Sequence, residues 1–218
     1  MKISLTKTGK RFNRDWIFRN VTYEFTAGNA YAITGPNGSG KSTLLQVIGG
    51  AIAMSDGKIE YSKNTEYRIQ HTEALTSKAL INPDEAFRYL AIAAPYLELI
   101  EEMTAIEFLS FHTQFKPFMA GIDNKKALSI IGLEKAANKQ IRYYSSGMKQ
   151  RLKLAQAIFS DVPCLLLDEP CTNLDVEGIN LYQQLVNDYC ADRLVIVSSN
   201  DPQEYGFCQE QISILDYK

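Results

Sequence analysis

A glycine-rich stretch that ends in a lysine is the part of the sequence best suited to chemistry. Residues 35–43 read Gly-Pro-Asn-Gly-Ser-Gly-Lys-Ser-Thr and match the phosphate-binding pattern G-x-x-x-x-G-K-[S/T] at every required position. Glycines have no Cβ, so the backbone curls and aims its N–H groups at a phosphate. Lys41 adds a positive charge for the β- and γ-phosphates, and the Ser42 hydroxyl is a ligand for Mg²⁺. The stretch therefore predicts a triphosphate site.

The residues on either side of this stretch provide the setting that phosphate binding needs. Residues 31–34 are apolar, as in a buried strand, and residues 43–48 have helical spacing. A helix that begins at the loop presents unpaired N–H groups and the positive end of its dipole. The alternative is a glycine turn that only joins a strand to a helix. The residues predicted to bind the triphosphate here are Gly35, Pro36, Asn37, Gly38, Ser39, Gly40, Lys41, Ser42 and Thr43.

An aromatic residue upstream of the loop is a candidate for stacking on adenine. Phe12 lies between residues 2–6 and 21–25, whose alternation of polar and apolar side chains predicts an antiparallel pair of strands. Trp16 competes for the stacking role, and an ordinary core or surface role for Phe12 is the other alternative. The antiparallel pair is expected to pack beside the nucleotide core.

Two adjacent carboxylates follow a second apolar stretch. Residues 164–167 predict a central parallel strand because they are apolar on both faces. Asp168 and Glu169 at its carboxyl end are costly to bury unless they meet a cation or take part in proton transfer. Asp168 is placed to hold Mg²⁺, and Glu169 to orient and polarise an attacking water. The alternative is a strand that happens to run into an acidic turn.

The other segments predict alternating strands and helices. Thr104 and Glu107 form a capping box, and helices over roughly 104–159 with no strand between them indicate an all-helical subdomain. Ser145 and Ser146 suit the start of a further helix, where an anion could also bind. The remaining expectations are strands over 57–61, 194–197 and 212–215, a strand candidate over 67–70, and a helix over 176–190.

Length and composition favour an ordinary globular protein. The chain has 218 residues, 45% hydrophobic and 22% charged, enough for one large domain. The net charge of −2 and the lack of a basic stretch argue against nucleic acid as a partner. No signal peptide is expected, and no apolar run approaches the length of about 18 residues that spans a bilayer. The four cysteines lack metal-binding spacing and are expected to be reduced thiols.

The order of these motifs resembles that of ATP-binding cassette (ABC) proteins along essentially the whole chain. Residues 35–43 resemble the Walker A motif, residues 144–151 the signature motif, and residues 164–170 the Walker B motif with its catalytic glutamate. The resemblance implies an α/β fold with a mostly parallel P-loop core, an antiparallel β subdomain and an inserted helical subdomain. One ABC domain over 1–218 is expected, with the core at about 1–93 and 161–218 and the helical part at about 94–160.

The resemblance also implies a mechanism and partners. Two copies would pack head to tail, each ATP lying between the Walker A motif of one and the signature residues Ser145, Ser146 and Gly147 of the other. Asp175 falls in the D-loop, and Ser42 and Asp168 would hold Mg²⁺. Both half-sites occur in one chain, which favours a homodimer. Separate permease subunits would hold the protein at the cytoplasmic face of a membrane, and residues 94–103 would dock them unless these side chains pack inward.

Three departures from the family pattern concern hydrolysis. The first glycine of the signature is Ser146. The glutamine expected near Ala94 or Pro95 is missing, with Glu98 as a substitute. The usual histidine after the 194–197 strand is Asn200, which can donate to a phosphate but carries no charge; the alternative is that Asn200 only caps a turn. We therefore expect intact ATP binding with slow hydrolysis.

Three functions are compatible with the motifs. The leading interpretation is the ATPase subunit of a transporter. A soluble ABC ATPase that acts as an assembly module, or a nucleotide switch that scarcely hydrolyses, are the alternatives. A kinase or GTPase is disfavoured because the chain lacks an Asn-Lys-x-Asp segment for guanine and carries a signature motif.

Overall fold

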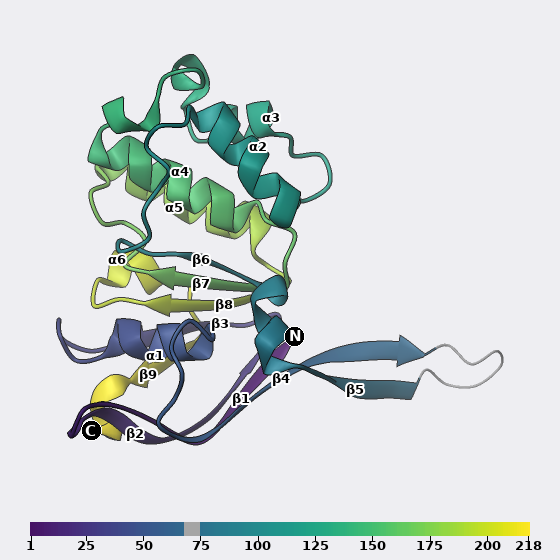
Figure 1. The fold of residues 1–218 in the computed structure, drawn as a ribbon, viewed down its shortest axis with the longest axis vertical. Helices are drawn as coiled ribbons and strands as arrows, with labels where there is room; N and C mark the ends of the chain where they lie inside the picture. The colour runs from purple at the N-terminus through teal and green to yellow at the C-terminus, as the bar shows by residue number, and fades with distance from the viewer. Residues whose placement is uncertain (68–74) are drawn as a thin grey trace.

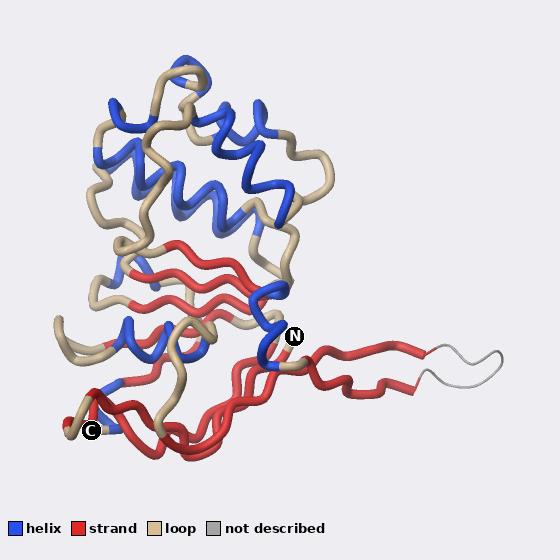
Figure 2. Tube along the Cα trace, in the orientation of Figure 1, coloured by secondary structure: helices blue, strands red, loops and turns tan. Residues whose placement is uncertain are grey.

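Two sheets and a layer of helices make up the structure (Figure 1). The computed structural model describes residues 1–67 and 75–218. One sheet is antiparallel with the order β2-β1-β4-β5, and the other is parallel with the order β6-β7-β8-β3-β9. Figure 2 shows the larger helices gathered on one side of the parallel sheet. The predicted class, a parallel core with an antiparallel sheet and helices, is confirmed.

The elements follow one another as strands and helices of ordinary length. The strands are β1 (Lys2–Phe12), β2 (Asp15–Thr26), β3 (Ala30–Thr34), β4 (Asp56–Tyr67), β5 (Leu75–Ile81), β6 (Leu90–Ala93), β7 (Cys164–Asp168), β8 (Leu194–Ser198) and β9 (Glu210–Ser213). The α-helices are α1 (Lys41–Ile48), α2 (Ala105–Phe115), α3 (Asn124–Ile130), α4 (Ser146–Ile158), α5 (Val176–Tyr189) and α6 (Pro202–Tyr205). The 3₁₀ turns are η1 (Pro83–Tyr89), η2 (Glu134–Ala136), η3 (Ile141–Tyr143) and η4 (Ile214–Tyr217).

The parallel sheet separates two hydrophobic cores. Successive side chains of a strand point to opposite faces, so a strand that is apolar throughout contributes to both cores. In β7, Leu165 belongs to the core shared with α4 and α5, and Leu166 to the core shared with α1 and the antiparallel sheet. Val195 and Ile196 of β8 divide in the same way. The prediction of a central parallel strand at residues 164–167 is confirmed, because β7 lies between β6 and β8.

Local capping signals form as the sequence predicts. The Thr104 hydroxyl accepts the Glu107 N–H at 3.4 Å, and the Glu107 carboxylate accepts the Thr104 N–H at 2.8 Å, which completes the capping box of α2. Ser145 is the N-cap of α4, where its hydroxyl accepts the Met148 N–H at 3.2 Å. These bonds satisfy N–H groups that have no partner inside their helices.

The structure differs from the sequence-based expectations in several strands. The last strand was expected over 212–215, but β9 ends at Ser213, and Ile214 begins η4, where its side chain is buried. Strands β5 and β6 were not predicted. The candidate strand over 67–70 begins at the last residue of β4, and residues 68–70 lie outside the described residues. The β4–β5 hairpin stands out from the body of the molecule in Figure 1.

Substituting Gly57 is expected to weaken the antiparallel sheet more than substituting a glycine with the same backbone conformation. Gly57 has φ +83°, and a Cβ there would lie 2.3 Å from the Lys7 carbonyl oxygen of β1. Gly28 has φ +80° with no described atom within 4 Å of its Cβ position. Both alanine variants lose about 1–2 kcal/mol through left-handed strain, and Gly57→Ala loses about 1–3 kcal/mol more through the clash. Urea unfolding measures both free energies, and equal losses would contradict the clash.

A half-buried histidine joins α2 to the residues that follow α4. His112 Nε2 lies 2.9 Å from the Ser160 hydroxyl, and burial together with the charge of Lys116 lowers the pKa of His112 to about 4. Lys116 in turn donates to the Leu90 carbonyl at 2.6 Å, at the start of β6. The imidazole is therefore neutral in the folded protein at neutral pH.

The depressed pKa of His112 predicts a loss of stability in acid. The unfolded chain protonates this imidazole near pH 6.5 and the folded chain only near pH 4, so its contribution is complete above pH 6.5 and is lost as the pH falls toward 4. The unfolding free energy of the parent should therefore fall relative to His112→Gln by about 1–2 kcal/mol between pH 7.5 and 4.5. Chemical denaturation of both proteins at the two pH values checks this, and a constant difference would refute it.

Candidate nucleotide site

The loop of residues 35–43 joins β3 to α1 at the carboxyl edge of the parallel sheet. Gly40 precedes α1 with φ +100°, and a Cβ there would lie 2.4 Å from Ile17 Cγ2. A Cβ on Gly35 would lie 2.7 Å from Ile214 Cγ2. The loop is thus packed between β2 and η4, and both positions need glycine for space and for backbone conformation.

Lys41 lies inside this loop. Its ammonium donates to the Gly35 carbonyl at 2.9 Å and to the Pro36 carbonyl at 3.2 Å, and the residue is 4% exposed. No carboxylate within the described part of the chain forms an ion pair with it. A buried ammonium held only by carbonyl oxygens keeps its charge available for an anion.

Asp168 supplies an unpaired carboxylate oxygen next to the loop. The residue ends β7 and is 1% exposed, and its Oδ1 has no hydrogen-bond partner among the described residues. Burial raises the pKa of the Asp168 carboxyl, whereas the facing hydroxyls of Ser198 and Ser42 and the charge of Lys41 lower it. A hydroxyl and one carboxylate beside a phosphate loop fit Mg²⁺, which takes few protein ligands and completes its shell with phosphate and water.

Asn200 reaches the same loop from the end of β8. Its amide Nδ2 donates to Asn37 Oδ1 at 3.2 Å, across 163 residues of sequence. The turn that follows is capped by Asp201, whose carboxylate accepts the Gln203 N–H at 2.9 Å. The cap of that turn is therefore Asp201, and the Asn200 side chain bonds Asn37 of the loop instead. Glu169 stands beside Asp168 with an unusual φ of +41°.

The signature residues lie elsewhere. Ser145, Ser146 and Gly147 line a cavity of about 390 Å³ with Arg151 and Asp175. The described residues that line it include none from the loop 35–43. The Asp175 carboxylate accepts the Gly178 N–H at 2.8 Å and forms an ion pair with Arg151 at 3.3 Å. The bond from Gly178 is the main cause that lowers the pKa of Asp175, and the Arg151 charge lowers it further. One chain thus brings Asp168 to the loop of residues 35–43, and the cavity at residues 145–147 is lined by other described residues.

Both aromatic candidates for adenine are accessible. Phe12 ends β1 at the tip of the β1–β2 hairpin and is 46% exposed, with the Lys10 ammonium 4.8 Å from the ring centroid. Trp16 is 38% exposed under the Arg11 guanidinium. The residue after Trp16 contacts Gly40, so this hairpin adjoins the loop.

Tyr96 was expected only in the docking segment, but the structure brings it to the site. It follows β6, whose neighbour in the sheet is β7, and its phenol interacts with Gln46 of α1 and with the Asp168 charge. Burial, with a smaller contribution from the Asp168 charge, raises the pKa of Tyr96 to about 12. Glu98, the expected substitute for glutamine, instead lines a groove with Lys149 and Lys153. No pattern in the sequence predicts this position for Tyr96, because a tyrosine in a loop has no distinctive spacing.

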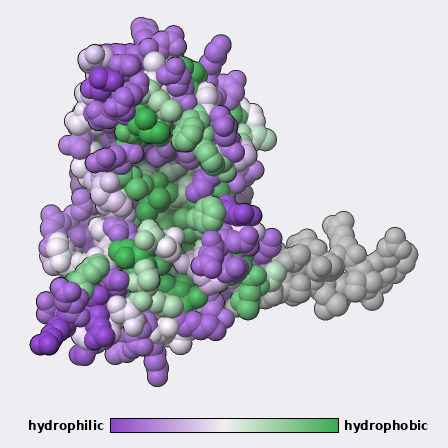
Figure 3. Space-filling view, in the orientation of Figure 1, coloured by the Kyte–Doolittle hydropathy of each residue, from purple (hydrophilic) through white to green (hydrophobic). Residues whose placement is uncertain are grey.

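The docking segment divides between core and surface. Leu99 packs inward at 7% exposed, whereas Tyr96 at 44% and Ile100 at 40% remain accessible. Figure 3 shows apolar side chains gathered across the middle of one face, between the helical layer and the antiparallel sheet. Inward packing therefore holds for Leu99, whereas Tyr96 and Ile100 stay accessible to a partner.

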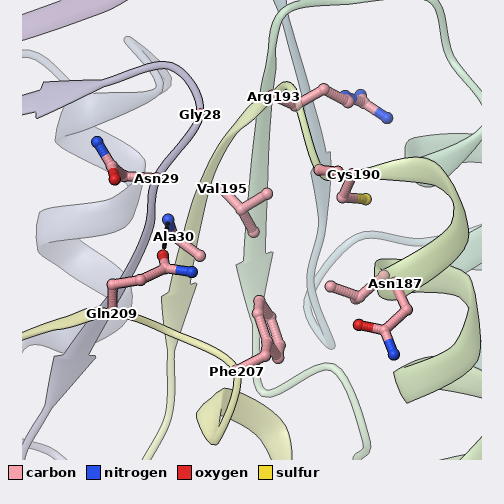
Figure 4. Close-up of a pocket in the computed structure, with 11 residues that line it drawn as sticks. Gly28, Asn29, Ala30, Asn187, Cys190, Arg193, Val195, Phe207 and Gln209 are labelled. Atoms are coloured by element: carbon pink, nitrogen blue, oxygen red, sulfur yellow. Dashed lines mark hydrogen bonds between the residues drawn. The ribbon is translucent and has the colours of Figure 1, made fainter.

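A further cavity, of about 250 Å³, lies at the opposite edge of the sheet (Figure 4). It is lined where β3 and β8 begin, and the Gln209 side chain accepts the Ala30 N–H there at 2.6 Å. The Arg193 side chain points away from these two residues. Ligands of open parallel sheets bind at the carboxyl ends of the strands, whereas this cavity lies at their amino ends.

Comparison with known sequences assigns the family. The family model described as ABC transporter matches residues 18–172. The chain belongs to the ABC transporter family. This ABC subunit is similar to the cytochrome c biogenesis ATP-binding export protein CcmA of Rhizobium meliloti, with 30% identity over 95% of this chain and 94% of the relative. CcmA of Agrobacterium fabrum is 28% identical over 96% of this chain and 94% of the relative.

Solved structures show the same fold. MJ0796, a bacterial ABC transporter cassette solved as a dimer, gives a TM-score of 0.75 at 23% identity, covering 97% of the ABC subunit and 94% of MJ0796. A putative ABC transporter ATP-binding protein from Pyrococcus furiosus gives 0.78 at 16% identity with full coverage of both chains. The family resemblance in the motif order is confirmed. In the described residues of the ABC subunit, no helix has the length and apolar character to cross a membrane.

Neutralising two carboxylates of the ABC subunit is expected to change its unfolding free energy in opposite directions. Burial raises the pKa of Asp168, so its charge opposes folding at pH 7, and Asp168→Asn should raise the unfolding free energy of the nucleotide-free protein by about 1 kcal/mol. The bond from the Gly178 N–H, with a smaller contribution from the Arg151 charge, lowers the pKa of Asp175. The charged form therefore stabilises the fold, and Asp175→Asn should lower stability. Urea unfolding at pH 7 checks both signs, and a loss in both variants would refute the account of Asp168.

Proposed function

We propose that this chain binds and hydrolyses ATP to drive a membrane transporter. The observation that carries the proposal is the meeting of three groups at one sheet edge: the Lys41 ammonium, the unpaired Asp168 oxygen and the Asn200 amide. Together they offer a cation, a metal ligand and a neutral donor, which suits a magnesium triphosphate. Mg²⁺, when bound, neutralises charge on the β- and γ-phosphate oxygens.

Each residue has a separate role in this proposal. The N–H groups of residues 35–43 hold the phosphates, and Lys41 neutralises the β- and γ-phosphates. Ser42 and Asp168 hold the metal. Glu169 orients the attacking water and takes up its proton, and Asn200 exchanges its bond with Asn37 for one to the γ-phosphate. Phe12 stacks on adenine, with Trp16 as the competing platform.

A second copy completes the site in this proposal. Ser145, Ser146 and Gly147 line a cavity away from their own Walker A loop, which supports contact with the nucleotide of a partner. The hydroxyl of Ser145 accepts a bond from Met148, which leaves its O–H free to donate to phosphate. We infer a head-to-tail homodimer in which Asp175 lies close to the interface.

The proposed role in transport is supported by the names of the similar proteins. Their names describe ATP-binding export proteins. We extend this role to the chain, with separate permease subunits docked through the exposed Tyr96 and Ile100 beside a helical subdomain at about 94–160. Through these permeases it would lie at the cytoplasmic face of a membrane.

We expect this chain to hydrolyse ATP slowly. The family's glutamine is missing near Ala94 or Pro95, and Tyr96, which follows, stands beside Asp168. The uncharged Asn200 stands where the family has histidine. Both departures favour slow turnover, below about 1 per second. A switch that scarcely hydrolyses is the second candidate, and these two residues favour it.

Two substitutions separate binding from hydrolysis. Lys41→Ala should weaken Mg-ATP binding about 10- to 100-fold because a charge-assisted contact is lost. Glu169→Gln should retain ATP and lower phosphate release about 100-fold or more because the water loses its base. Equilibrium binding and steady-state phosphate release measure these effects, with Lys125→Ala, an exposed lysine outside the loop, as control. Equal activity in Glu169→Gln and the parent would overturn the catalytic assignment.

A further inference from the structure

The turn after β7 holds Glu169 in an unfavourable backbone conformation. Its φ of +41° lies in the left-handed region, which is unfavourable for a residue with a side chain. Such conformations persist only where the surrounding structure fixes them, and they concentrate at functional sites. The bonds that fix this turn therefore decide where the Glu169 carboxylate points.

Three consecutive residues of the turn are each held by a different element. The Glu169 N–H donates to the Ser198 carbonyl of β8 at 2.9 Å. The Pro170 carbonyl accepts Gln150 Nε2 of the signature helix α4 at 2.7 Å. The Cys171 N–H donates to Glu204 Oε1 of α6 at 2.7 Å. The first bond is made by backbone, and the other two depend on side chains.

Gln150 and Glu204 are buried polar residues whose side chains bond the backbone of this turn. Gln150 is 3% exposed and Glu204 is 5% exposed. Burying such groups costs free energy unless they are hydrogen-bonded, and leaving their partners unpaired costs more. Shielded from water, both bonds are effective constraints on the turn.

Glu204 is itself anchored on two further sides. The buried Tyr182 hydroxyl of α5 donates to the Glu204 carbonyl at 2.7 Å. The Ser199 hydroxyl, next to Asn200, donates to its carboxylate. Burial, with smaller contributions from the Asp201 and Glu169 charges, raises the pKa of Glu204, and the bonds from Ser199 and Cys171 act against it. The carboxylate thus joins the turn after Glu169 to the turn that carries Asn200.

We propose that Gln150 and Glu204 are positioning residues that hold Glu169 in its left-handed conformation for catalysis. This rests on the proposed hydrolysis of ATP at Glu169. Gln150 also links Glu169 to the helix that begins at Ser146, so a shift of that helix moves the carboxylate that activates water. Occupation of the signature by the partner's nucleotide is in this way communicated to the chain's own catalytic residue.

Matched substitutions test the two side-chain bonds. Gln150→Met and Glu204→Met remove the donor and the acceptor with little change in shape, whereas Glu204→Gln keeps an acceptor. We expect kcat to fall about 10- to 100-fold in both methionine variants, with KM and Mg-ATP affinity within about threefold of the parent. Glu204→Gln should retain most of the parental kcat. Tyr61→Phe, which loses a buried 2.9 Å bond to the Ile48 carbonyl in the other core, should lower stability without this kcat effect.

Amide exchange separates this inference from the proposed function. Hydrogen–deuterium exchange of the peptide spanning 168–175 should become faster in both methionine variants and not in Tyr61→Phe, whether or not the parent hydrolyses ATP. A parent without ATPase activity would refute the proposed function alone. Unchanged protection of this peptide, or a kcat loss matched by an equal loss of nucleotide affinity, would overturn the positioning role.

Discussion

Three parallel strands end at one edge of the sheet, and the chemistry of the site depends on that alignment. β3 delivers the phosphate loop, β7 delivers Asp168, and β8 delivers Asn200. Parallel pairing fixes the register, with Leu167 opposite Val197 and Ala32 opposite Val197 on the other side. A shift of one residue would turn every side chain to the other face, so the two cores that hold the register also hold the site.

The site concentrates groups that oppose folding. Lys41, Asp168 and Glu204 are all buried, and Glu169 has a strained backbone. Protein interiors tolerate such groups only when packing elsewhere compensates, and the sheet provides this with apolar residues on both faces. The unpaired oxygen of Asp168 and the free charge of Lys41 are then understandable as groups awaiting a charged ligand.

Local patterns were predictable from the sequence, and long-range contacts were not. The phosphate loop, the strand before Asp168 and the capping box of α2 depend on residues close in sequence, and the structure has all three. A place for Asn200 near the phosphate loop was expected only through the family resemblance, and its bond to Asn37 was not predicted. Gln150 and Glu204 were overlooked, because a buried glutamine or glutamate on a short amphipathic segment has no signature until its distant partner is known. The last strand ends early because Ile214 packs against the Gly35 position, a contact that strand propensity cannot show.

Calorimetric titration of the protein tests most directly whether the loop of residues 35–43 binds a magnesium triphosphate. Titration with Mg-ATP should show saturable binding of one nucleotide per chain, with affinity that falls when Mg²⁺ is chelated. No saturable binding at millimolar Mg-ATP, across a range of salt concentrations, would contradict the account.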